Sequence, residues 1–209
     1  MYCILTFITI AIAASLSYAT HTNRTEAHEC GQPDVVCHGL KKGCVASDFH
    51  TCEVLATIAS HDNDTLWIDL SAFASKENLQ LNFTNRWIGV GFSLSGQMPN
   101  SAVVHCFNDE HNVVQAKLTF NVPNRHFNTG WKDIDQTPLQ VDSAKLENGH
   151  LQCIVRLKKH FTLKNPQKDD SVYDLVQDHH LILATGPLKD GSISRHDKAP
   201  HISEKAHKF

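Results

Sequence analysis

Methionine and basic charge are both scarce in this sequence. The 209 residues include two methionines, of which one is the initiator Met1 and the other is Met98. Lysine and arginine total 19 against 22 aspartates and glutamates, which gives a net charge of −3. This charge balance gives no excess of basic residues of the kind that binds nucleic acid and no polybasic patch for a membrane surface. The hydrophobic content of 41% is typical of a globular protein.

Several catalytic and metal-binding motifs are missing as well. The chain contains no Gly-x-Ser-x-Gly nucleophile elbow and no His-Glu-x-x-His zinc motif, so we assign no catalytic residues. A Cys-x-x-Cys-His site for covalent haem attachment is also absent. These absences argue against a hydrolase, a zinc protease and a c-type cytochrome.

The sequence has one long apolar stretch, at its N-terminus. Residues 1–19 carry no charge and end in Ser-Tyr-Ala, with small residues at the two positions that a signal peptidase reads. This pattern predicts a secretory signal peptide and a secreted, extracellular mature chain without a membrane span. The alternative is an uncleaved anchor, but the apolar core of residues 4–14 is too short to cross a bilayer comfortably.

Three N-glycosylation sequons follow this stretch. They begin at Asn23, Asn63 and Asn82. Each one alone is weak, because such tripeptides arise by chance. Together with a signal peptide they modestly support a secreted glycoprotein.

The mature chain retains six of the seven cysteines, an even number that predicts disulfide bonds in an oxidising compartment. Cys106 and Cys153 each lie in an apolar β-type run, and we expect them to join neighbouring strands. The other four would staple the N-terminal segment; they are Cys30, Cys37, Cys44 and Cys52. Zinc held by these four with His38 or His50 is the alternative, but zinc sites usually contain closer cysteine pairs.

From residue 54 onward, short β-prone runs alternate with turn residues, which predicts an all-β, immunoglobulin-like antiparallel sandwich. We expect a Cys-rich segment at 20–53 packed on the domain, the sandwich at 54–203 and a polar tail at 204–209. One helical turn is expected near 172–176. The expected strands are 54–59, 65–70, 79–83, 86–93, 101–107, 113–120, 139–146, 150–157 and 181–185.

The central stretch at residues 87–98 combines an apolar strand with a Ser/Gly turn that ends at Met98. Its sequence is Trp-Ile-Gly-Val-Gly-Phe-Ser-Leu-Ser-Gly-Gln-Met, and Ser-Ala-Val-Val-His-Cys follows at 101–106. These residues resemble the DOMON domain, the β-sandwich of the dopamine β-monooxygenase N-terminal type. The similarity is strongest to the DOMON part of the ferric-chelate reductases. Further agreement lies at 30–52, 151–156, 183–187, 193–196, 200 and 203.

The resemblance implies a cofactor and its ligands. In haem-binding members, including the cytochrome domain of cellobiose dehydrogenase, a non-covalent haem b sits between a methionine and a histidine. Those positions correspond here to Met98 and His196, and Trp87, Phe92 and Phe127 are candidates for lining the pocket. The simpler alternatives are a surface methionine and one histidine of a polar tail that also contains His201 and His207.

The resemblance therefore leads to two alternative functions. The first is a secreted b-type cytochrome that exchanges single electrons with a redox protein or a small-molecule donor or acceptor. The second is a haem-free extracellular module that binds a sugar or another small ligand, or mediates adhesion. The chain lacks the reeler domain and the transmembrane cytochrome of the ferric-chelate reductases, so we do not expect ferric reduction by this chain alone.

Overall fold

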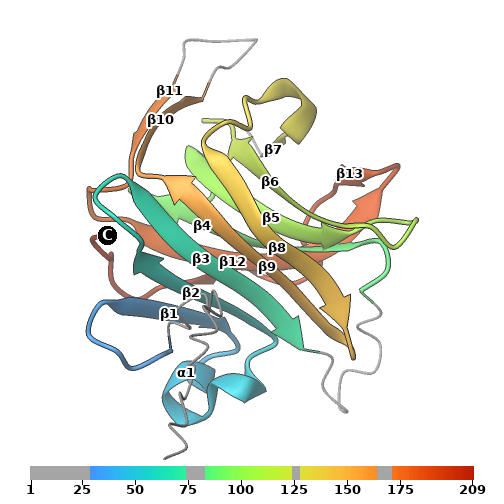
Figure 1. Cartoon of the computed structure of the whole chain (residues 1–209), viewed down its shortest axis with the longest axis horizontal. Helices are drawn as coiled ribbons and strands as arrows, with labels where there is room; N and C mark the ends of the chain where they lie inside the picture. Colours follow the sequence, from blue (N-terminus) through green and yellow to red (C-terminus); the bar gives the residue numbers. More distant parts are fainter. Residues whose placement is uncertain (1–28, 74–82, 124–127, 164–170) are drawn as a thin grey trace, which may run out of the picture.

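Two antiparallel β-sheets pack face to face (Figure 1). The computed structural model describes residues 29–73, 83–123, 128–163 and 171–209. The first sheet has the order β1-β2-β3-β9-β8, with the bounds Val35–Leu40, Val54–Ser60, Thr65–Phe73, His150–Lys158 and Leu139–Glu147. The second has the order β13-β12-β4-β5-β6-β7, with the bounds Ser192–Ile193, His180–Lys189, Arg86–Ser93, Ser101–Asn108, Val114–Asn121 and Asn128–Thr129. The predicted β-sandwich is confirmed.

The remaining elements are short. Strand β14 (His201–Ile202) pairs with β12, and β10 (His160–Leu163) pairs with β11 (Ser171–Asp174). The helical turns are α1 (Cys44–Ser47), η1 (Phe49–Thr51) and η3 (Trp131–Asp133). Within the described residues, no helix has the length and apolar character needed to cross a membrane.

Most expected strands are present, and the differences are local. The helical turn expected near 172–176 is wrong, because β11 pairs with β10 and the chain turns only after Asp174. Residues 79–82 of one expected strand lie outside the described residues. Strand β1 was not expected; it lies inside the Cys-rich segment and pairs with β2 along its whole length.

The core lies between the two sheets. Ile88, Val90 and Phe92 of β4 alternate with outward-facing residues and are fully buried, as are Ile68 and Leu70 of β3. Burial of each such side chain contributes roughly 1.5–3 kcal/mol relative to exposure. The alternation therefore fixes which face of β4 points into the core and which face points away from the first sheet.

A disulfide crosses this core. Cys106 of β5 is bonded to Cys153 of β9, so the predicted pairing is correct. The expectation that it joins neighbouring strands is wrong, because β5 and β9 belong to different sheets. Both cysteines occupy inward-facing positions: Cys106 shares its face of β5 with Val104, and Cys153 shares its face of β9 with Val155. The bond therefore links the two layers of the sandwich.

The N-terminal segment is stapled by the other two disulfides, Cys30–Cys37 and Cys44–Cys52. The second lies directly on Gly39 of β1, where any Cβ would overlap both sulfur atoms. Glycine at this position therefore lets the strand and the disulfide pack together. Through β1, the segment provides the edge strand of the first sheet.

The C-terminal residues also pack against the sandwich. His207 exchanges two backbone hydrogen bonds of 2.8 Å with His179, and Phe209 packs edge-on against Phe92, with ring centroids 5.8 Å apart.

Among the three glycosylation sequons, the one at Asn63 lies in the exposed turn between β2 and β3. Asn23 and Asn82 lie outside the described residues.

Removal of the disulfide between the sheets should destabilise the protein more than removal of an N-terminal staple. Cys106 and Cys153 close a loop of 47 residues, whereas Cys30 and Cys37 close one of 7. The chain-entropy relation gives about 4 kcal/mol for the long loop and about 2.4 kcal/mol for the short one. Urea unfolding of the two double-alanine variants measures this difference. Equal losses would contradict it.

Candidate functional site

The second sheet is covered on the face that points away from the core. Residues 87–93 of β4 and 101–108 of β5 are all buried, although only every second residue faces the first sheet. The outer face holds a cavity of about 530 Å³, within the usual range for small-molecule sites. Its lining includes Trp87, Gly89, Gly91, Met98, Pro99, Val103, His105, Asn121, Asn128, Ile182, Ala184, Ile193, Ser194, Arg195 and His196.

Two glycines form the floor of this cavity. Gly89 and Gly91 occupy successive outward positions of β4, so no side chain rises from the strand there. A Cβ on Gly89 would lie 2.9 Å from the His105 ring, whereas one on Gly91 would meet its nearest neighbour at 3.5 Å. Gly89 thus makes room for a neighbouring ring, whereas a methyl group at Gly91 would make only ordinary contacts. A flat, apolar floor of this kind fits a planar ligand.

Met98 reaches the cavity from the turn between β4 and β5. Ser93 Oγ donates to the Gln97 carbonyl at 2.8 Å and accepts from the Gln97 N–H, and Ser101 Oγ donates to the Met98 carbonyl at 2.6 Å. Gly96 has a φ of +70°, a left-handed conformation that favours glycine. The Ser/Gly composition of this stretch therefore builds the turn that presents the thioether.

His196 comes from the segment that follows β13 and crosses the same sheet face. Asp197 donates its N–H to the Thr185 carbonyl of β12 and forms an ion pair of 2.5 Å with Arg86 of β4. Lys198 pairs with Glu53 at 2.8 Å. These contacts hold the chain directly after the histidine, because Asp197 binds the second sheet and Lys198 reaches the residue before β2.

The His196 imidazole is oriented as a metal ligand would be. Its Nδ1 lies 2.8 Å from the Lys198 carbonyl oxygen. A carbonyl only accepts, so Nδ1 carries a hydrogen, and in the neutral ring Nε2 has the lone pair. Metal-binding histidines commonly have this second contact, which fixes the ring and its tautomer.

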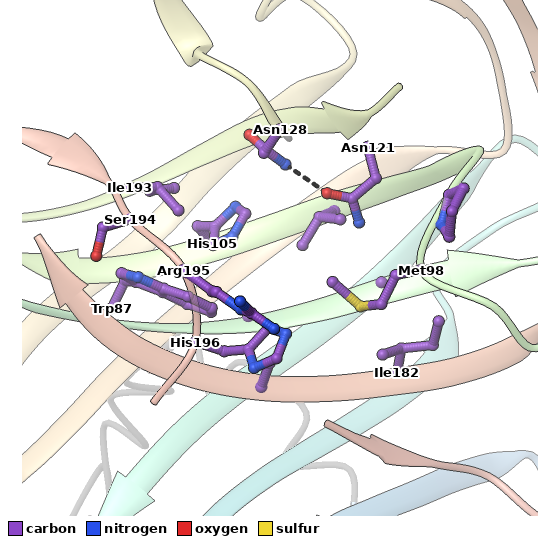
Figure 2. Close-up of a pocket in the computed structure, with 15 residues that line it drawn as sticks. Trp87, Met98, His105, Asn121, Asn128, Ile182, Ile193, Ser194, Arg195 and His196 are labelled. Carbon is purple, nitrogen blue, oxygen red and sulfur yellow. Dashed lines mark hydrogen bonds between the residues drawn. The ribbon is translucent and has the colours of Figure 1, made fainter. Parts of the chain in front are cut away.

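The structure brings the two predicted residues, Met98 and His196, to one cavity (Figure 2). Their side chains extend over the same face of the sheet, from the turn before β5 and the segment after β13. Neither is fully buried. Among the other candidates, Trp87 lines the cavity, Phe92 lies in the core instead, and Phe127 is outside the described residues.

His105 of β5 is a further site residue, and the sequence analysis did not single it out. It is 3% exposed and packs edge-on against Trp87, and its ring also lines the cavity. Burial lowers its pKa to about 3, so the imidazole is neutral at physiological pH. A polar residue in a strand with both faces buried is the signal that could have identified it.

The polar lining is rich in donors. Among the described residues that line the cavity, none is aspartate or glutamate, whereas Arg195 contributes a guanidinium. The Trp87 indole nitrogen is buried without a hydrogen-bond partner in the described part of the chain. The residues described also contain no group of three or more His, Cys, Asp or Glu placed to hold a metal ion. The cavity therefore suits a largely apolar ligand with acceptor groups.

The two floor glycines should respond differently to substitution. Gly89→Ala forces the His105 ring to move and should cost about 1–3 kcal/mol of stability, the usual range for overpacking. Gly91→Ala makes only ordinary contacts and should unfold close to the parent midpoint. Urea unfolding of both variants tests this difference. A larger loss for Gly91→Ala would contradict the described packing.

Comparisons with known proteins agree with this architecture. The human and mouse DOMON domain-containing proteins FRRS1L are 31% and 29% identical to the chain over 124 residues. These residues are 58% of this chain and 39% of each relative, so the chain spans about two fifths of their length. The cytochrome domain of Myriococcum thermophilum cellobiose dehydrogenase has the same fold, with a TM-score of 0.52, 16% identity and coverage of 83% of this chain and 82% of that one.

The family model for the DOMON domain matches residues 62–186. The match includes Met98 and most strands of both sheets, and it ends before His196. It covers more than half of the sequence, and the chain therefore belongs to the DOMON family.

Proposed function

We propose that the cavity binds haem b non-covalently, with Met98 and His196 as the two axial ligands, and that the protein transfers single electrons. The observation that carries this proposal is that these two residues, far apart in sequence, line one cavity above a glycine floor. The fold shared with the cellobiose dehydrogenase cytochrome domain supports it.

The residues present fit such a group. The floor at Gly89 and Gly91 and the apolar side chains of Val103, Ile182 and Ala184 suit a planar macrocycle. The His196 Nε2 has its lone pair available, and Met98 contributes the thioether. The described lining has no carboxylate of its own and includes the Arg195 guanidinium, which suits the carboxylate groups that haem b carries.

The ligand pair determines the type of chemistry. Haem supplies one iron that changes its charge by a single electron. Imidazole and thioether bind iron in both oxidation states, and the thioether favours the reduced one. Because Met98 and His196 would both bind the iron, no position on it would be left for a substrate. The role of the chain is then to hold the iron and to shield it, while a redox protein or a small molecule exchanges the electron.

An extracellular location is part of the proposal. The three disulfides of the structure are typical of chains that mature in an oxidising compartment. The charge-free residues 1–19 have the character of a signal peptide, and Asn63 lies in an exposed turn that has room for a glycan.

Absorption spectra of the secreted protein supplied with haem test the ligands. The parent protein should give a low-spin spectrum that sharpens on reduction with dithionite. Met98→Leu keeps a similar volume but removes the sulfur, and His196→Ala removes the imidazole, so each should shift the spectrum to high spin or abolish it. The expected loss of haem affinity is at least about tenfold, which equals about 1.4 kcal/mol.

Two matched variants serve as controls. Leu94→Ala changes an exposed residue of the same turn as Met98, and His111→Ala removes a histidine whose side chain is 78% exposed. Both should keep the parent spectrum. A folded parent protein that stays colourless with haem would refute the proposal and favour a haem-free binding module.

A further inference from the structure

A chain of buried hydrogen bonds begins at the turn that carries Met98. The Met98 carbonyl accepts from Ser101 Oγ at 2.6 Å, and Ser101 Oγ in turn accepts from Asn121 Nδ2 at 2.8 Å. Ser101 is fully buried and Asn121 is 7% exposed. A carbonyl oxygen only accepts, so the Ser101 hydroxyl must donate to it and can only accept from Asn121. The amide of Asn121 is thereby oriented with Oδ1 away from Ser101.

The chain continues to the cavity floor. Asn128 Nδ2 donates to Asn121 Oδ1 at 3.0 Å and to Thr119 Oγ1 at 2.8 Å, and Thr119 Oγ1 lies 3.0 Å from His105 Nδ1. Figure 2 shows His105, Asn121 and Asn128 side by side along the cavity. Each bond runs in one direction, because the preceding bond has already determined which atom donates.

This direction determines the tautomer of His105. Thr119 is fully buried, and its oxygen already accepts from Asn128. Its hydroxyl hydrogen needs an acceptor, and His105 Nδ1 is the atom within reach. The reverse arrangement would leave that hydrogen buried and unpaired, which is costly. His105 Nδ1 therefore accepts, and the single ring hydrogen lies on Nε2.

The two histidines of the cavity thus have opposite tautomers. His196 carries its hydrogen on Nδ1 because its partner there is a carbonyl, and its Nε2 is a lone pair suited to iron. His105 carries its hydrogen on Nε2, which lies over the Gly89 floor, 3.2 Å from where a Cβ would stand. The two histidines therefore differ in role because of their hydrogen-bond partners: His196 is suited to bind a metal, and His105 is suited to donate a hydrogen bond.

We propose that His105 is a preset, neutral hydrogen-bond donor to the group bound in the cavity, fixed by the polar chain that starts at the Met98 carbonyl. The described lining of the cavity contains no aspartate or glutamate, so this donor selects a ligand with oxygen acceptors. The inference rests on the proposed function for the identity of that ligand, whose acceptors are the carboxylates of haem b.

The tautomer is tested first, on ligand-free protein. Long-range ¹H–¹⁵N NMR spectra of the histidine rings, recorded from pH 5 to pH 8, should show His105 protonated on Nε2 alone throughout this range. In Thr119→Val the Nδ1 contact is lost, and the ring should populate both tautomers. Thr119→Ser retains the hydroxyl and should give the parent pattern. A parent His105 that carries its hydrogen on Nδ1, or that becomes charged in this range, would overturn the proposal.

The donor role is tested by haem titration of the same proteins. Thr119→Val should bind haem about twofold more weakly than the parent and Thr119→Ser, because about half of its His105 rings would lack the Nε2 hydrogen. The parent should prefer haem over its dimethyl ester, which lacks the anionic acceptors, and this preference should shrink by a similar factor in Thr119→Val. Unchanged haem affinity in Thr119→Val would overturn the role.

A second pair covers the case in which Thr119→Val does not fold. His105→Gln keeps an amide donor and should retain most of the affinity, whereas His105→Leu should lose about tenfold. Failure of the proposed function has a different signature. The parent would then bind no haem at all, and the ligand-free NMR spectra would still decide the tautomer of His105.

Discussion

Burial of both faces of β4 and β5 is the constraint on which the site depends. One face of β4 fills the core with Ile88, Val90 and Phe92, and the other has Gly89 and Gly91 where large side chains would stand. Missing side chains leave space above a strand. The Met98 turn and the segment through His196 lie over that space and close it into a cavity. The absence of side chains on one strand thus creates the site.

The cavity combines a rigid scaffold with residues from irregular segments. Strands supply the floor and the hydrogen-bonded frame, whereas Met98 and His196 come from connections, as binding residues on β-scaffolds commonly do. Such residues are useful only if their segments are fixed. Here Ser93 and Ser101 hold the turn, and the Arg86–Asp197 pair holds the histidine segment. Membership of the DOMON family identifies the scaffold, whereas the ligand that the cavity binds depends on the side chains of this site.

Buried polar groups in this site form a connected series. Ser101, Thr119 and His105 are almost fully buried, and unpaired they would each destabilise the fold. Joined through Asn121 and Asn128 they are paired and hold one another in a single orientation. The same contacts that stabilise the sheet therefore also set the direction of donors at the cavity floor.

Most strands of this protein and its bonded cysteines could be predicted from residue patterns, and the family resemblance singled out Met98 and His196, which line one cavity. Alternating apolar residues predicted most strands, an even number of cysteines predicted the disulfides, and the near absence of methionine drew attention to Met98. How these parts meet could not be predicted and is seen only in the folded chain. Cys106 and Cys153 join different sheets, and His105 proved to line a cavity, because contacts between residues far apart in sequence leave no local pattern. The tautomers of His105 and His196 follow from partners that only the folded chain brings within reach.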